Sequence, residues 1–221
     1  MLRLIRGPLA SLALLALPLT AQAAESVTEY ELDNGLEIVV IEDHRSPAVV
    51  HMLWYRVGAA DEPAGHSGIA HFLEHLMFKA TDELASGEFS QIVEANGGSD
   101  NAFTSWDYTA YFQQLPVSAL ETAMAMEAER MRGLNPPLDH TLSERDVVVE
   151  ERKQVLDSNP MARLSEQMRY ALYTNHPYGR PIIGWMHEMR ELNWDKAKAF
   201  YDQYYRPDNA ILILMGDFTA Q

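Results

Sequence analysis

Residues 71–75 read His-Phe-Leu-Glu-His, and this segment carries the clearest chemical potential in the chain. On a helix, residues four apart lie on the same face, so His71 and His75 can present two imidazoles to one metal ion. Glu74 lies beside His75, close enough to reach a metal-bound water without being a ligand. Zinc held by two imidazoles and one carboxylate keeps an open position and lowers the pKa of its bound water. The pattern therefore predicts a hydrolytic zinc site with Glu74 as general base.

A third metal ligand has to come from another segment. Residues 143–156 are expected to form a helix, with Ser143 near its N-terminus, that contains Glu144, Glu150 and Glu151. Glu144 and Glu151 are seven residues apart, so they share one face at a separation of roughly 10 Å. Glu150 lies about 100° around the helix and is expected in solvent. Valines beside the shared face indicate partial burial, where a carboxylate needs a partner such as a metal. An ordinary charged helix surface remains the alternative.

The other six histidines lack ligand spacing. They are expected to be surface or loop residues: His44, His51, His66, His140, His176 and His187.

Composition narrows the class of protein. The 221 residues are 47% hydrophobic and 22% charged, which is typical of a globular chain rather than a disordered one. The absence of Cys excludes disulfides, Cys-ligated zinc and thiol catalysis. The net charge of −15 argues against a nucleic-acid binder and fits a soluble protein or one with cationic partners such as basic peptides.

Residues 1–24 have the pattern of a secretory signal peptide. Arg3 and Arg6 precede an apolar run at 9–17, and Ala-Gln-Ala at 21–23 matches a cleavage site. The apolar run is too short to span a bilayer, and no Cys follows it to carry a lipid. We therefore expect an exported protein of the bacterial periplasm without a stable membrane anchor.

The remaining residues, 25–221, are expected to form one domain. Their strands and helices come in runs rather than in strict alternation, which predicts an α+β fold with a mostly antiparallel sheet covered by helices on one face. The expected strands are 30–32, 36–41, 48–57, 102–104, 109–114 and 211–215, with a hairpin turn at Asp33-Asn34-Gly35. The expected helices are 67–78, 88–95, 117–131, 143–156, 162–173 and 194–205.

Several separate blocks together resemble the pitrilysin/insulinase family of zinc metallopeptidases, which includes the mitochondrial processing peptidases and their bacterial relatives. The resemblance covers nearly all of residues 25–221 and is carried by six segments: the Leu-x-Asn-Gly-Leu hairpin at 32–36, and 68–75, 97–104, 144–151, 176–181 and 216–218.

The resemblance implies a role for each matching residue. His71 and His75 match the family's zinc ligands, and Glu74 matches its general base. In the Val-Val-Val-Glu-Glu segment the second glutamate aligns with the third ligand, which selects Glu151 over Glu150. Glu144 matches an acidic residue that supports the site from outside the ligand set.

The resemblance also implies a strand that binds substrate. Asn101, Ala102 and Phe103 match the strand along which the family holds an extended peptide by β-augmentation. A plain sheet strand is an equally good reading of these three residues.

The chain matches only the N-terminal half of the family's usual two-half clamshell. The second half, which normally supplies an Arg/Tyr pair for substrate orientation, has no counterpart in the sequence. We therefore expect a second homologous domain or subunit to close the chamber. The favoured function is a zinc endopeptidase domain that hydrolyses peptides or small unfolded proteins. The alternatives are a non-catalytic or partner-dependent subunit of a peptidase complex and, less specifically, a periplasmic binding module.

Overall fold

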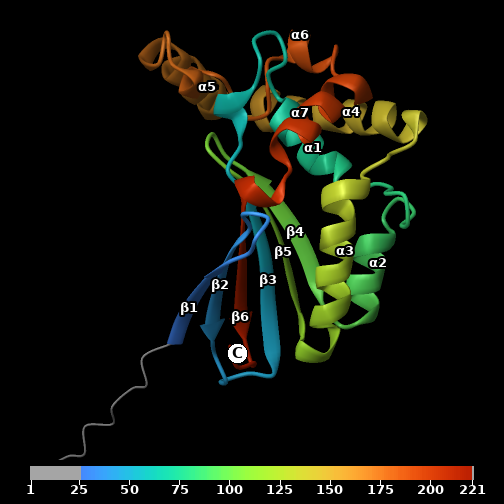
Figure 1. Cartoon of the computed structure of the whole chain (residues 1–221). Helices are drawn as coiled ribbons and strands as arrows, with labels where there is room; N and C mark the ends of the chain where they lie inside the picture. Colours follow the sequence, from blue (N-terminus) through green and yellow to red (C-terminus); the bar gives the residue numbers. More distant parts are fainter. Residues whose placement is uncertain (1–25, 221) are drawn as a thin grey trace, which may run out of the picture.

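The computed structural model describes residues 26–220, which form one six-stranded sheet with helices at one face and one end (Figure 1). The sheet order is β1-β2-β6-β3-β5-β4. The strands are β1 (Ser26–Glu31), β2 (Glu37–Glu42), β3 (Ala48–Tyr55), β4 (Ser99–Thr104), β5 (Thr109–Pro116) and β6 (Ala210–Gly216). The signal-peptide prediction for residues 1–24 lies outside the described residues.

Among the strands of residues 26–220, most neighbours run antiparallel, and only the β2–β6 pair is parallel. The β1–β2 hairpin closes through the expected turn, where Gly35 has a φ of +83°, a value that favours glycine. Burial alternates along β3 and β6, so one side chain in two faces the helices. The predicted α+β class with a mostly antiparallel sheet is confirmed.

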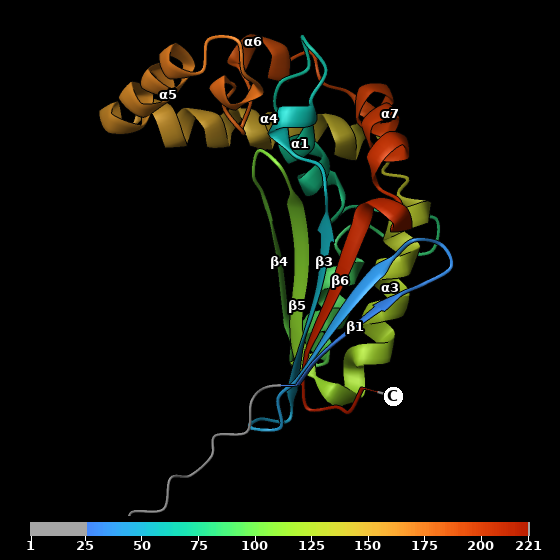
Figure 2. The same ribbon diagram turned by 60° about the vertical axis from the view of Figure 1, so that its left-hand side comes forward.

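The helices fall into two groups, which the two views separate clearly (Figures 1 and 2). Helices α2 and α3 lie along one face of the sheet. The other helices gather at the end of the sheet where β3 ends and β5 begins. The helices are α1 (Ile69–Leu76), α2 (Glu88–Ala95), α3 (Leu120–Gly133), α4 (Leu138–Arg152), α5 (Pro160–Leu172), α6 (Met186–Met189) and α7 (Trp194–Tyr204).

Several element boundaries differ from the prediction, among them both ends of α4 and the start of β4. Helix α4 begins at Leu138 rather than at Ser143, because Pro137 takes the N-cap position and its carbonyl accepts a hydrogen bond from Thr141 Oγ1 at 3.1 Å. The α-helical part of α4 ends at Arg152, and one π-helical turn follows at Lys153–Asp157. Strand β4 begins three residues earlier than predicted, at Ser99, because pairing with β5 overrides the low strand propensity of polar residues.

A buried polar network joins β3, β5 and α3, and it corrects the expectation for His51. This residue lies in β3 and is 2% exposed, with its Nδ1 2.7 Å from Gln113 Oε1. Gln113 in turn donates to Glu127, which holds Arg130 through two hydrogen bonds of 2.7 Å. His51 is therefore a core residue satisfied by its neighbours, not a surface residue.

Within residues 26–220, none of the helices has the length and apolar character needed to cross a bilayer.

Candidate metal centre

Helix α1 sets the direction of the two histidines. Phe72, Leu73 and Leu76 are at most 1% exposed and fix the rotation of the helix against the core. The opposite stripe then carries His71 and His75, whose ring centroids lie 4.7 Å apart. The amphipathic pattern of this short helix is thus what presents both imidazoles to one point.

Helix α4 brings a carboxylate to the same point. Glu151 Oε2 lies 3.7 Å from His71 Nε2 and 3.5 Å from His75 Nε2. One ligand atom from each of the three residues lies within 4.8 Å of the others. Ligands placed 2.0–2.2 Å from a tetrahedral zinc ion are separated by about 3.4 Å, so the observed spacing fits such an ion with little adjustment.

The other nitrogen of His75 is held from behind. His75 Nδ1 lies 2.8 Å from Glu144 Oε1, and Glu144 Oε2 lies 2.6 Å from Lys79 Nζ. A carboxylate on Nδ1 keeps the proton on that nitrogen and leaves Nε2 free to coordinate a metal. Glu144 is thus placed to orient a ligand, and Lys79 balances its charge.

The electrostatics of the cluster favour a bound cation. Burial, and then the nearby His75, lower the pKa of His71 to about 4, so its imidazole is neutral at pH 7 and able to coordinate. Burial alone would lower the pKa of His75, but its hydrogen bonds to Glu144 and Glu151 outweigh that effect and raise it to about 9. Two carboxylates therefore hold a positive charge at this point, and a metal ion can take the place of that proton.

Glu74 lies on the same helix but its carboxylate points to strand β4. Its side chain is 9% exposed, and Oε2 accepts a hydrogen bond from Thr104 Oγ1 at the end of that strand. Burial raises the pKa of Glu74, while the hydrogen bond from Thr104 opposes the shift. A carboxylate with a raised pKa next to a metal site is a better proton acceptor than an exposed one.

The predicted substrate strand, β4, is one of the two edge strands of the described sheet. Among the described strands, β4 pairs only with β5, so its other edge is open to an extended chain. Asn101 and Phe103 are exposed and Ala102 is half-buried. The strand ends at Thr104, which contacts Glu74, so an added peptide strand would run toward the cluster.

The structure separates the glutamates of α4 as the spacing suggested. Glu150 is exposed and pairs with Lys153, whereas Glu144 and Glu151 both contact His75. The sequence does not predict two contacts of the site, that of Lys79 with Glu144 and that of Thr104 with Glu74. Lys79 lies three residues beyond the end of α1, so helical spacing from His75 does not place it, and its contact with Glu144 depends on the packing of α4. The position of Thr104 depends on the packing of β4 against α1 and had no local signal.

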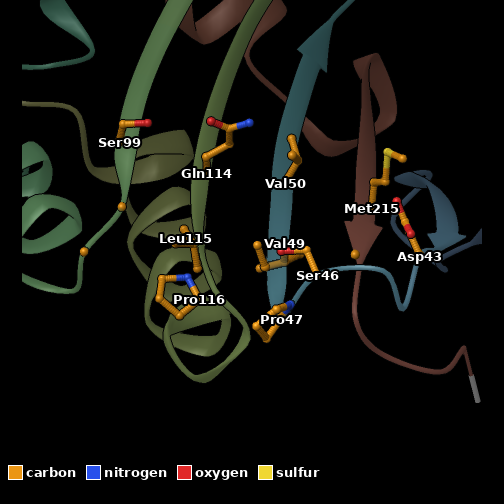
Figure 3. A pocket seen from close by; sticks show the side chains of 14 residues that line it. Asp43, Ser46, Pro47, Val49, Val50, Ser99, Gln114, Leu115, Pro116 and Met215 are labelled. Carbon is orange, nitrogen blue, oxygen red and sulfur yellow. The ribbon is translucent and has the colours of Figure 1, made fainter.

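A hollow lies at the end of the sheet that is far from the His-His-Glu cluster (Figure 3). Its volume is about 540 Å³, and its walls come from the ends of β3, β5 and β6 and the turn before β4. Its lining, within the described residues, contains one carboxylate, Asp43, and no histidine. It therefore lacks the donor set of a hydrolytic metal site.

The His-His-Glu cluster is a candidate metal site, and comparison with known proteins shows which family carries this fold. Residues 37–185 match the family model "Insulinase (Peptidase family M16)", and the chain belongs to this family. It is 40% identical over 198 residues to the zinc protease PqqE of Helicobacter pylori. The aligned region covers 89% of this chain and 44% of PqqE.

Solved structures show the same fold. A protease from Helicobacter pylori matches with a TM-score of 0.86 at 37% identity, over 90% of this chain and 48% of that one. The first half of the periplasmic protease PqqL from Escherichia coli matches with a TM-score of 0.81 at 28% identity, over 88% of this chain and 43% of that one. The chain thus spans a little under half the length of the Helicobacter pylori protease and of the crystallised first half of PqqL, and it matches the N-terminal half of its homologues.

Proposed function

We propose that the chain is a zinc-dependent endopeptidase domain that hydrolyses peptides or small unfolded proteins. The observation that carries the proposal is the convergence of His71, His75 and Glu151 on one point, with Glu74 beside them, in a member of a zinc protease family. Bound zinc would supply Lewis-acid activation of a water molecule at neutral pH.

The chain's own residues supply the other parts of the reaction. His71, His75 and Glu151 would hold the zinc ion, and Glu144 orients His75 through its Nδ1. Glu74 takes the proton of the attacking water and delivers it to the leaving amine, in the manner of a general base that then acts as an acid. Strand β4 aligns the substrate backbone through Asn101, Ala102 and Phe103, so that a peptide bond lies next to the ion.

Metal dependence is the direct test of this function. The purified protein is expected to bind one zinc ion and to cleave an unfolded peptide. Chelation should remove the activity, and added zinc should restore it. A protein that binds no zinc from solution would contradict the proposal at its first step. Cleavage that persists after complete removal of the metal would contradict it at the second.

Basic peptides are the substrate class that the charge favours. The chain carries 32 acidic and 17 basic side chains, and a shallow hollow of about 380 Å³ beside Glu151 is lined by Asp146 and Glu150. Negative charge near the site raises the local concentration of cationic substrates at low salt. In the same assay, peptides of equal length but different charge should be cleaved at different rates, and the basic peptides should be cleaved fastest. Equal rates at low salt would rule out this preference.

Removing the support of His75 is expected to weaken metal binding. In Glu144→Gln, the carboxylate that fixes His75 is replaced by a neutral amide, and the pair with Lys79 is lost. Loss of such an outer hydrogen bond typically costs about 10–100-fold in metal affinity. Competition with a chromophoric chelator would measure the change, with exposed Glu150→Gln as the matched control. Equal zinc affinities in the two variants would show that Glu144 does not tune the site.

The alternative function is a partner-dependent or non-catalytic subunit, and one observation favours it. The chain spans 44% of the length of PqqE and 48% of the solved Helicobacter pylori protease, so a second homologous half or subunit is expected to close the chamber. Activity that appears only when such a half is supplied would identify a partner-dependent subunit. Zinc binding without activity in both cases would identify a non-catalytic one.

We also propose that the protein is exported to the periplasm after removal of residues 1–24, as the charged, apolar and small-residue order of that segment suggests. N-terminal sequencing of the protein recovered from a periplasmic fraction tests this, and an intact Met1 would contradict it.

A further inference from the structure

The start of helix α1 lacks a cap of its own, and a buried glutamate from the preceding loop provides one. The N-cap residue is Gly68, which has no side chain to accept a hydrogen bond. Glu62 Oε1 instead accepts from Gly68 N at 3.0 Å and from Ala70 N at 3.1 Å. Glu62 is 3% exposed, and Ala70 is adjacent to His71. The first turn of the helix that carries the metal ligands is thus held by a residue outside it.

Glu62 is in turn held by Arg180, which also contacts the β4–β5 hairpin. The Arg180 guanidinium donates through Nη1 to the backbone carbonyl of Glu62. The backbone carbonyl of Arg180 accepts from Trp106 Nε1 at 3.0 Å. Trp106 lies at the tip of the hairpin, two residues after Thr104, and the tip reaches the helical end of the sheet (Figure 2).

The same three segments, 58–62, 105–107 and 176–180, meet closely enough to be called a loop junction. Ala59 N and Ala60 N donate to the carbonyls of Ser105 and Trp106 at 2.9 and 2.8 Å. A Cβ on Gly58 would lie 2.4 Å from the carbonyl oxygen of Ser105, so the backbones are already in contact. Such packing transmits a displacement of one segment to the others instead of absorbing it.

We propose that Glu62 and Arg180 are positioning residues of the peptidase site. Glu62 fixes the first turn of α1 and therefore His71, while Arg180 locks Glu62 to the hairpin whose Thr104 holds Glu74. The loop junction thereby fixes the position of Glu74 relative to His71, although it contacts neither side chain directly. This inference rests on the proposed function: its metal-affinity part rests on zinc binding alone, and its kinetic part rests on peptide cleavage as well.

The chemistry of Glu62 defines a conservative variant. Burial raises the pKa of Glu62 to about 8, so near neutral pH its carboxyl holds α1 as a hydrogen-bond acceptor rather than through its charge. The amide oxygen of Gln offers the same acceptor, whereas Ala offers none. Glu62→Gln should therefore preserve what Glu62→Ala loses.

Metal affinity is the first readout. Glu62→Ala is expected to weaken zinc binding about tenfold, as loss of outer support to a ligand does. Glu62→Gln should stay within about twofold of the parent, and Arg180→Met should weaken binding about threefold. Arg190→Met, a change of an exposed arginine outside the junction, is the matched control. A lower melting temperature in Glu62→Ala with unchanged zinc affinity would reduce Glu62 to a stability role and overturn the proposal.

Kinetic coupling is the second readout. Arg180→Met should lower kcat about tenfold with little change in KM, because a misplaced base affects chemistry more than binding. Thr104→Val removes the hydrogen bond to Glu74, so in that background Arg180→Met should lower kcat by no more than about twofold. Fully additive effects would show that Arg180 does not act through the hairpin. If the parent binds zinc but cleaves nothing, the proposed function fails, and the zinc affinities of the Glu62 and Arg180 variants still decide the positioning role.

Discussion

Glu74→Gln is expected to lower kcat by about 10²–10⁴-fold while zinc remains bound, because the amide cannot take a proton from water. The substitution is close to isosteric, and the amide oxygen can still accept the hydrogen bond that Thr104 donates to Glu74. His71 and His75 keep their places, since neither depends on Glu74 for its orientation. Steady-state kinetics together with zinc content measured on the same sample separate the loss of the base from loss of the metal.

The stability of the variant is a further check on that separation. Burial raises the pKa of Glu74, so the ionised carboxylate carries a desolvation cost in the folded protein that the neutral amide does not. The melting temperature of Glu74→Gln at neutral pH should therefore equal or exceed that of the parent. Glu121→Gln is the matched control, since this exposed glutamate lies on α3, outside the cluster and outside the acidic hollow beside it, and should leave kcat unchanged. Full activity in Glu74→Gln would assign the base to another residue.

Much of the fold follows from local pattern, and the exceptions have physical causes. The Asn34-Gly35 turn and the alternation along β3 identify those strands directly. The start of β4 at Ser99 could not be predicted, because the polar residues there are held in the strand by their partners on β5. The capping side chain of Ser143 predicts a helix start at that residue. The helix in fact begins five residues earlier, at Leu138, with Pro137 as its N-cap residue.

Part of the site also follows from the local sequence, and the rest depends on tertiary packing. The spacing of His71 and His75 already brings the two imidazoles together, since four residues make about one helical turn. That Glu151 meets them depends on how α4 crosses α1, which no pattern in either helix specifies. The resemblance to a known family selected Glu151, and the distances of 3.5 and 3.7 Å place it there independently. Glu62 and Arg180 are separated by more than a hundred residues, so only the folded chain reveals their contact.

His71→Ala is expected to remove the metal site while leaving the fold intact. The apparent zinc-binding free energy of structural zinc sites is about 10–16 kcal/mol, so one of four ligands contributes about 2.5–4 kcal/mol. Its loss corresponds to a decrease in zinc affinity of about 10²–10³-fold. Helix α1 should tolerate the change, because Ala favours helices and the apolar stripe through Phe72, Leu73 and Leu76 is untouched.

The melting temperature, measured with and without zinc, distinguishes loss of the site from loss of the fold. Zinc at about 1,000 times its Kd should stabilise the parent by about 4.1 kcal/mol, because it binds only the folded state. The same zinc concentration should stabilise His71→Ala far less, whereas His187→Ala, at a histidine whose side chain is 81% exposed, should respond like the parent. Without metal, His71→Ala should melt no lower than the parent, since His71 Nδ1 is buried with no hydrogen-bond partner among the described residues and the pKa of the ring is depressed. Equal stabilisation of His71→Ala and the parent by zinc would place the metal elsewhere, and with it the chemistry proposed for Glu74.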